Sequence, residues 1–141
     1  MAGTLLLDSE GLSKLYRKDP TVLGFIQAAR QESVRVATST MTVVQAGHER
    51  VHPARISWTL SRIDVHDVTR EVADQATRLL RTHRLHGHKY AIDAVLAALA
   101  QSAALPATLL TSDPEDLSLL CGPASKSSRC RTQPSLSVPP S

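Results

Sequence analysis

Short runs of apolar residues alternate with amphipathic stretches along most of the chain. Strands are predicted at about residues 4–8, 34–37, 63–66 and 107–110, the first and last as continuous apolar runs typical of strands buried on both faces. Apolar residues at helical spacing predict helices at about residues 10–17, 20–32, 40–48, 53–60, 70–85, 89–104 and 114–120. This alternation predicts an α/β fold, a three-layer sandwich with a central, mainly parallel sheet of about four to five strands flanked by helices.

Capping residues and helix breakers set several of these boundaries. Asp19 is a favourable N-cap residue, and Pro20 fits the first helical position behind it. Gly87 is expected to interrupt the helical structure and so separate the two long helices in the second half of the sequence. Met41 and Trp58 are assigned to the core.

Two of the predicted strands end in an aspartate. The first strand runs directly into Asp8, and the last is followed by Thr111, Ser112 and Asp113. In sheets of this class ligands bind at the carboxyl ends of the strands. Both aspartates are therefore expected in one acidic pocket at that edge.

A third acid, Asp93, lies in the first turn of the alanine-rich helix predicted at 89–104. The helix dipole favours an acid in a first turn, which is one explanation for it. The other is a metal ligand, since Mg²⁺ and Mn²⁺ take oxygen ligands. Several carboxylates in one pocket repel each other, so at neutral pH they need a cation or must take up protons.

These motifs, in this order and spacing, resemble those of a PIN domain, the nuclease fold shared by bacterial toxins of the virulence-associated protein C (VapC) type. The resemblance covers about residues 4–121 and rests on three segments: Leu5-Leu6-Leu7-Asp8-Ser9, Ile92-Asp93-Ala94-Val95-Leu96-Ala97-Ala98 and Leu110-Thr111-Ser112-Asp113-Pro114. By position, Asp8, Asp93 and Asp113 match the family's catalytic, metal-binding acids, and Thr111 matches the threonine before the last acid.

What the resemblance implies is a PIN-like domain over residues 1–123 that acts as a metal-dependent endoribonuclease. Such an enzyme hydrolyses RNA phosphodiesters with a water activated by Mg²⁺ (or Mn²⁺). The resemblance also implies a toxin–antitoxin system, with a small antitoxin protein as partner, and a homodimer.

One position departs from the family pattern, which usually places a glutamate where this chain has Gln45. An amide oxygen can still accept a hydrogen bond or bind a metal, but one negative charge is lost. Glu10, Glu49 and Asp116 compensate for that charge if they face the same pocket, and the preferred alternative for all three is an exposed, solvated acid. The alternative function is a PIN-fold binding or dimerisation module with a degenerate acidic site. The candidate accessory residues are Gln45, Thr111, Ser9 and Asp116.

A different enzyme class has a fainter signal at the same place. Asp8-Ser9-Glu10 after a strand resembles the opening motif of haloacid-dehalogenase-type phosphatases. That chemistry requires a second aspartate two residues on, where this chain has Glu10, so the PIN interpretation is preferred.

A basic run precedes Asp93 and includes Arg81, Arg84 and Lys89. These three are candidates for holding RNA phosphates, and the alternative is a solvated helix end where cations are favoured. The spacing H-x-x-H-x-H of His83, His86 and His88 is compatible with zinc, although the fit is poor.

Composition and charge restrict the possible partners and location of the protein but do not identify its function. Of 16 basic residues, three lie after residue 123 in a segment without acids, so residues 1–123 carry 13 basic and 13 acidic residues. The net charge by itself therefore gives little support for nucleic-acid binding. Residues 124–141, rich in Ser and Pro, are predicted to form a disordered basic tail. Two cysteines without a metal-ligand pattern, no signal-peptide pattern and no membrane-length apolar run predict a cytoplasmic protein that does not enter a membrane.

Overall fold

A central parallel sheet forms the middle layer of the protein. The computed structural model describes residues 3–102, 107–111 and 130–133. The sheet has the strand order β3-β2-β1-β4-β5, and each neighbouring pair is parallel. Its strands are β1 (Thr4–Leu7), β2 (Arg35–Ser39), β3 (Asp64–His66), β4 (Ala107–Leu110) and β5 (Cys130–Gln133). The predicted α/β sandwich with a parallel sheet of about four to five strands is confirmed.

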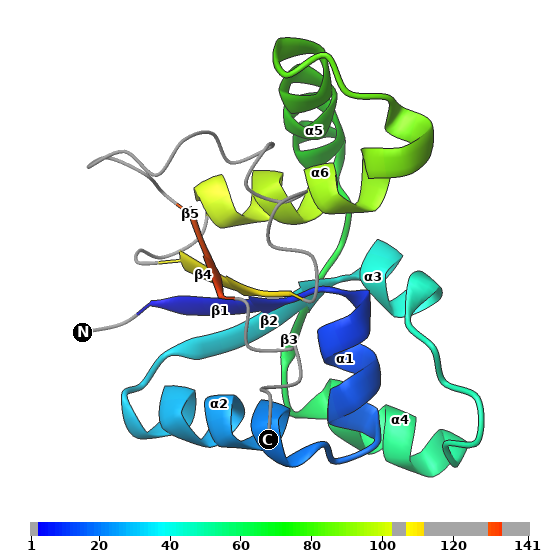
Figure 1. Ribbon diagram of the computed structural model, residues 1–141, viewed down its shortest axis with the longest axis vertical. Helices are drawn as coiled ribbons and strands as arrows, with labels where there is room; N and C mark the ends of the chain where they lie inside the picture. Colours follow the sequence, from blue (N-terminus) through cyan, green and yellow to red (C-terminus); the bar gives the residue numbers. More distant parts are fainter. Residues whose placement is uncertain (1–2, 103–106, 112–129, 134–141) are drawn as a thin grey trace, which may run out of the picture.

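Helices cover both faces of the sheet (Figure 1). They are α1 (Ser9–Tyr16), α2 (Pro20–Gln31), α3 (Thr40–Gln45), α4 (Pro53–Ser61), α5 (Arg70–Thr82) and α6 (Gly87–Ser102). In Figure 1, α5 and α6 lie over one face, and α1, α2 and α4 lie over the other. Successive residues of a strand point to opposite faces, so Leu6 packs in the α5–α6 cluster while Leu5 and Leu7 pack in the α1–α2 cluster.

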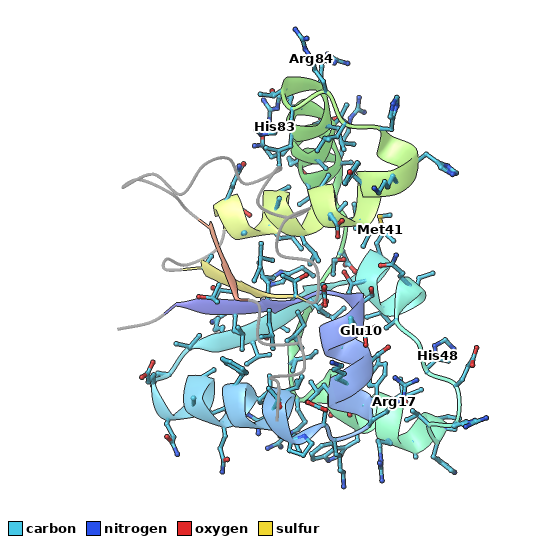
Figure 2. The ribbon with its side chains drawn as sticks, in the orientation of Figure 1. Glu10, Arg17, Met41, His48, His83 and Arg84 are labelled. Atoms are coloured by element: carbon cyan, nitrogen blue, oxygen red, sulfur yellow. The ribbon has the colours of Figure 1, made fainter. Side chains whose placement is uncertain are left out.

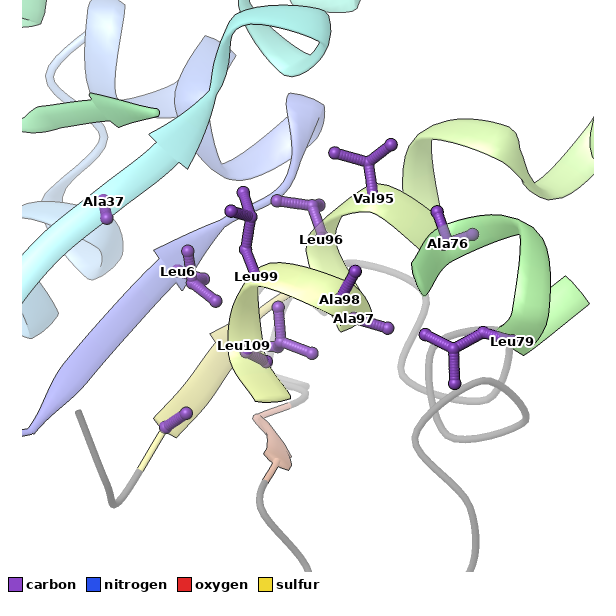
Figure 3. Close-up of a cluster of buried hydrophobic side chains, with 13 residues drawn as sticks. Leu6, Ala37, Ala76, Leu79, Val95, Leu96, Ala97, Ala98, Leu99 and Leu109 are labelled. Atoms are coloured by element: carbon purple, nitrogen blue, oxygen red, sulfur yellow. The ribbon is translucent and has the colours of Figure 1, made fainter. Parts of the chain in front are cut away.

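The α5–α6 side of the core is aliphatic and tightly packed (Figure 3). Every residue from Ala94 to Ala100 is buried, and alanine at four of these seven positions lets α6 approach the sheet closely. Leu96 and Leu109 are completely buried in this cluster. Truncating either leucine to alanine is expected to cost about 2–5 kcal/mol of unfolding free energy.

Several helix boundaries differ from the prediction by two or three residues. The helix predicted to reach His48 ends at Gln45, and Ala46 is already extended, with ψ at 134°. The Ser13 hydroxyl donates a hydrogen bond of 2.8 Å to the Gly47 carbonyl oxygen, which draws this segment onto α1. Gly87 does not end the first of the two long helices, because α5 already ends at Thr82 and Gly87 is the first residue of α6. The turn between α5 and α6 forms instead at Arg84, whose φ is 54°.

Two further predictions are corrected. Trp58 is 59% exposed and is not part of the core, whereas Met41 does pack against the α5–α6 cluster. Residues 130–133, assigned to a disordered tail, form β5 beside β4, with Ala107 opposite Cys130. An edge strand is held by backbone hydrogen bonds, so this polar segment needs no hydrophobic pattern. The helix predicted at 114–120 lies outside the described residues. None of the described helices is long and apolar enough to cross a membrane.

Candidate functional site

Asp8 sits at the carboxyl end of β1 and is the N-cap residue of α1. Its Oδ1 accepts a hydrogen bond of 2.7 Å from the Gly11 backbone N–H, and its carbonyl oxygen accepts one of 2.9 Å from the Leu12 N–H. The residue is only 7% exposed. An aspartate directly after a buried strand and before a helix therefore serves two purposes, because it caps the helix and holds its carboxylate at the sheet edge.

Thr111 fixes the second carboxylate oxygen of Asp8. β1 and β4 are parallel neighbours with Leu7 opposite Leu110, so the residues that follow them lie side by side. The Thr111 hydroxyl donates a hydrogen bond of 2.6 Å to Asp8 Oδ2, and Thr111 is completely buried. The two strands that were predicted to run into aspartates are therefore neighbours in the sheet. Asp113 follows two residues later in the sequence and lies outside the described residues.

Buried hydroxyl groups continue this edge at the end of β2, and they were not identified from the sequence. Thr38 Oγ1 donates to the Leu7 carbonyl oxygen at 2.8 Å, which ties the end of β2 to the end of β1. Ser39 Oγ accepts from the Thr42 N–H at 3.0 Å and lies 2.7 Å from Thr42 Oγ1. The Thr-Ser-Thr run of residues 38–40, which ends β2 and begins α3, was the available signal for this polar edge.

Asp93 lies in α6 but not in its first turn. The helix begins at Gly87, two residues earlier than predicted, so Asp93 falls in the second turn, where the helix dipole contributes little. Its side chain is half-buried, and the fully buried stretch of α6 begins at the next residue, Ala94. The amino-terminal half of α6 passes over the carboxyl edge of the sheet in Figure 1. The dipole explanation for this acid is thereby weakened.

The other candidate accessory residues are spread around the start of α1 and the end of α3. Gln45 is the exposed last residue of α3, one helical turn beyond Met41, which packs against the α6 side of the core. Ser9 is half-exposed at the start of α1, and Glu10 beside it is exposed (Figure 2). Glu49 lies beyond the end of α3 and is exposed, as expected for a solvated acid. Asp116 lies outside the described residues.

The basic run occupies the connection between α5 and α6. Arg81 is exposed in the last turn of α5, and Lys89 places its Nζ 5.0 Å from the centroid of the Tyr90 ring. Figure 2 shows Arg84 at the outer end of α5, well away from Glu10 and the start of α1. The three histidines of this run do not gather into a metal site. Within residues 3–102, 107–111 and 130–133, no three His, Cys, Asp or Glu residues form a group that could hold a metal ion.

Two solved structures share the arrangement of this chain, although no protein-family model and no curated protein matches its sequence. One is VapBC2 from Rickettsia felis, solved bound to a DNA fragment from their promoter. It is 15% identical, with a TM-score of 0.65, and the match covers 92% of this chain and 97% of the other. The second is PAE2754 from Pyrobaculum aerophilum, 20% identical, with a TM-score of 0.55 and coverage of 85% and 87%. At these identities the similarity establishes the fold alone.

Proposed function

The chain has a PIN-like fold of the VapC kind, and we propose that it is a metal-dependent endoribonuclease, the toxin of a toxin–antitoxin pair. The observation that carries this proposal is the buried carboxylate of Asp8, oriented by Gly11 and Thr111 at the carboxyl edge of a parallel sheet. In α/β sheets this edge is where ligands bind. Proteins commonly hold a reactive group by this kind of fixed, partly desolvated placement.

The donor chemistry at this edge fits Mg²⁺ or Mn²⁺. Both ions prefer carboxylate oxygens, and Asp8 carries two, held in place by the Gly11 N–H and the Thr111 hydroxyl. Asp93 and Asp113 are the proposed further ligands. A bound divalent ion would lower the pKa of a coordinated water and stabilise charge on phosphoryl oxygens.

The chain's own residues hold the proposed metal ligand Asp8 in place and do not supply a nucleophile. Gly11 and Thr111 hold both oxygens of Asp8, so the carboxylate does not need to reorganise when the phosphodiester arrives. In hydrolysis the water oxygen bonds to phosphorus, the bond from phosphorus to the leaving oxygen breaks, and that oxygen takes up a proton. This chemistry requires no covalent intermediate on the protein, which suits a site built of carboxylates and hydroxyl groups.

The proposed partners follow from the same similarity. VapBC2 was solved as an assembly on promoter DNA. We infer for this chain a small antitoxin protein, RNA as the substrate and a homodimer as the assembly. Each is a proposal that rests on the fold and on the motifs around Asp8, Asp93 and Asp113.

The second candidate function is a binding or dimerisation module on the same fold. Gln45, exposed at the end of α3, favours it because the usual glutamate would add one charge to the acidic edge. A module without a working site has no need for metal. The two functions therefore differ in whether the protein binds Mg²⁺ or Mn²⁺.

The test is cleavage of a mixed-sequence single-stranded RNA with Mn²⁺, with Mg²⁺ and with EDTA. The parent protein is compared with Asp8→Asn, which keeps a good N-cap residue at α1 while removing the charge. Cleavage by the parent with a metal, and none by Asp8→Asn at an unchanged melting temperature, supports the nuclease. No cleavage by the parent, and no rise in its melting temperature with either metal, favours the binding module.

A further inference from the structure

The peptide group that joins Leu7 to Asp8 is held from both neighbouring strands. Its N–H, on Asp8, donates a hydrogen bond of 3.3 Å to the Leu110 carbonyl oxygen at the end of β4. Its carbonyl oxygen, on Leu7, accepts one of 2.8 Å from the Thr38 hydroxyl near the end of β2. Because a peptide group is planar, holding both of its polar atoms fixes the direction in which the chain enters Asp8.

The Thr38 hydroxyl acts just beyond the point where the pairing of β1 with β2 ends. The last register pair of these two strands is Leu6 with Ala37, whereas β1 and β4 stay paired as far as Leu7 and Leu110. Past Leu6, a side chain of β2 therefore holds the backbone of β1. Thr38 is completely buried, so this hydrogen bond is shielded from competing water.

The strand end that carries Thr38 is itself fixed by the start of α3. Ser39 is the N-cap residue of that helix, and its Oγ accepts a hydrogen bond of 3.0 Å from the Thr42 N–H. The hydroxyl oxygens of Ser39 and Thr42 lie 2.7 Å apart, and both residues are completely buried. Thr38 thus reaches Leu7 from a fixed position, with a β-branched side chain that has few rotamers.

The contacts of the Asp8 carboxylate depend on this backbone. Its Oδ1 accepts a hydrogen bond of 2.7 Å from the Gly11 N–H, and its Oδ2 accepts one of 2.6 Å from the Thr111 hydroxyl. Because one short side chain joins the carboxylate to the backbone, a turn of the peptide group before Asp8 moves both oxygens together. Hydrogen bonds weaken steeply away from their preferred geometry, so such a turn would weaken both contacts.

We propose that Thr38 is a positioning residue for the carboxylate of Asp8 and acts through the peptide group between Leu7 and Asp8. Its hydroxyl contacts the backbone before Asp8 and leaves the carboxylate to Gly11 and Thr111. The expected effect on metal binding rests on the proposed function, in which Asp8 is a metal ligand. A ligand that is already oriented binds its metal more tightly than one that must first be ordered.

Thr38→Val removes the hydroxyl and keeps a β-branched side chain of similar shape, while Thr38→Ser keeps the hydroxyl. If Thr38→Val does not fold, Thr38→Cys replaces it, because a thiol is a weaker donor. The matched control is Ser13→Ala. Ser13 is also buried and also donates a hydrogen bond of 2.8 Å to a backbone carbonyl oxygen, that of Gly47. Effects shared with this control report on stability, and effects confined to Thr38 report on Asp8.

The first measurement requires neither metal nor RNA. The Gly11 N–H lies in the first turn of α1, where donors have no partner within the helix, so its protection from hydrogen exchange depends on Asp8 Oδ1. In EDTA, the exchange of this amide is expected to be about fivefold or more faster in Thr38→Val than in the parent. Thr38→Ser and Ser13→Ala are expected to exchange there nearly as the parent does.

The second measurement is Mn²⁺ affinity, followed by the electron paramagnetic resonance signal of the free ion. Thr38→Val is expected to bind Mn²⁺ about tenfold more weakly than the parent, as for other losses of groups that orient a metal ligand. Thr38→Ser and Ser13→Ala are expected to keep the parent affinity. At saturating Mn²⁺, kcat for RNA cleavage should fall in Thr38→Val with little change in KM.

The outcomes separate this proposal from the proposed function. If the parent binds no Mn²⁺ and cleaves no RNA, the proposed function fails, and the exchange rate of Gly11 still decides whether Thr38 positions Asp8. If the parent binds Mn²⁺ and Thr38→Val keeps that affinity, the nuclease stands and the role of Thr38 is overturned. Unchanged exchange at Gly11, or equal effects in Thr38→Val and Ser13→Ala, also overturns it.

Discussion

The Thr111 hydroxyl donates a 2.6 Å hydrogen bond to Asp8 Oδ2 and so joins two residues that are 103 positions apart in the sequence. Both side chains are buried, which makes this contact sensitive to small changes. It also couples the stability of the sheet edge to the orientation of the proposed metal ligand. A substitution here should therefore affect both properties.

Thr111→Val tests that coupling with a side chain of similar shape. The variant leaves Asp8 Oδ2 without this buried donor, so we expect a loss of about 1–3 kcal/mol of unfolding free energy. Cleavage should fall as well, because the carboxylate is held by one donor fewer. Thr111→Ser keeps the hydroxyl and is the matched control. Urea unfolding and RNA cleavage are measured on both, and equal behaviour of Val and Ser would mean that the hydrogen bond matters for neither property.

Truncation tests the strand that the sequence did not predict. β5 pairs with β4 along the residues Cys130 to Gln133, so removing residues 124–141 would expose the backbone of β4. We expect the melting temperature to fall by several degrees, since a loss of about 1 kcal/mol alone shifts it by a few degrees in a domain of this size. Removal of residues 134–141, which spares β5, is the control. If both truncations melt like the full chain, the pairing of β5 contributes no stability.

The parts of the fold that could be predicted are those with a local chemical cause. The strand ending at Asp8 was predictable because a continuous apolar run meets a capping acid, and a second such run predicted its neighbour. The turn at Arg84 was not, because its positive φ places a residue other than glycine in the left-handed region. β5 carries no apolar periodicity, so its pairing with β4 had no signal in the sequence pattern. Trp58 was misassigned because an exposed tryptophan has no signal in the sequence pattern.

The candidate site, like the fold, was predictable only in part. Asp8 and Thr111 were predictable from the strand ends, because parallel strands bring their carboxyl ends to one edge. The hydrogen bonds that Thr38 and Ser39 make at this edge depend on strand pairing and helix geometry, which no short motif encodes. The roles proposed for Asp93 and Asp113 remain predictions.

Tyr16→Phe tests the buried hydroxyl of Tyr16, the last residue of α1. The Tyr16 hydroxyl has no partner within the described part of the chain, and burying such a group costs about 1–3 kcal/mol. We therefore expect Tyr16→Phe to unfold at a higher denaturant midpoint than the parent at pH 7. A variant with unchanged or lower stability would indicate that the hydroxyl is satisfied in solution.

The pH dependence of the same pair has a defined sign. Burial raises the pKa of Tyr16 above its ordinary value of 10.0, so the unfolded chain releases this proton at lower pH than the folded one. Above about pH 10 the unfolded state then binds fewer protons, and the free energy of unfolding falls as pH rises. Tyr16→Phe lacks this contribution. The stability difference between variant and parent should thus widen from pH 9 to pH 11, as measured by urea unfolding at each pH.

Gln45→Glu decides between a nuclease and a binding module. Gln45 lies one turn beyond Met41 on α3, the helix that follows β2 at the carboxyl edge of the sheet. If its side chain faces the acidic edge, a glutamate there adds one negative charge. Two unit charges about 4 Å apart interact by roughly 4 kcal/mol at an effective dielectric of about 20, which is an upper limit for the gain.

We expect the parent to show weak cleavage that prefers Mn²⁺ to Mg²⁺, because the site has one charge fewer than the usual pattern. Gln45→Glu should raise both the metal-dependent increase in melting temperature and the cleavage rate. Asp93→Asn should abolish cleavage while its melting temperature in EDTA stays close to that of the parent. The comparison uses one RNA substrate, both metals and matched melts for all three proteins. If the parent never cleaves and the glutamate restores neither metal binding nor cleavage, the acidic edge is not a metal site, and the fold serves as a binding module.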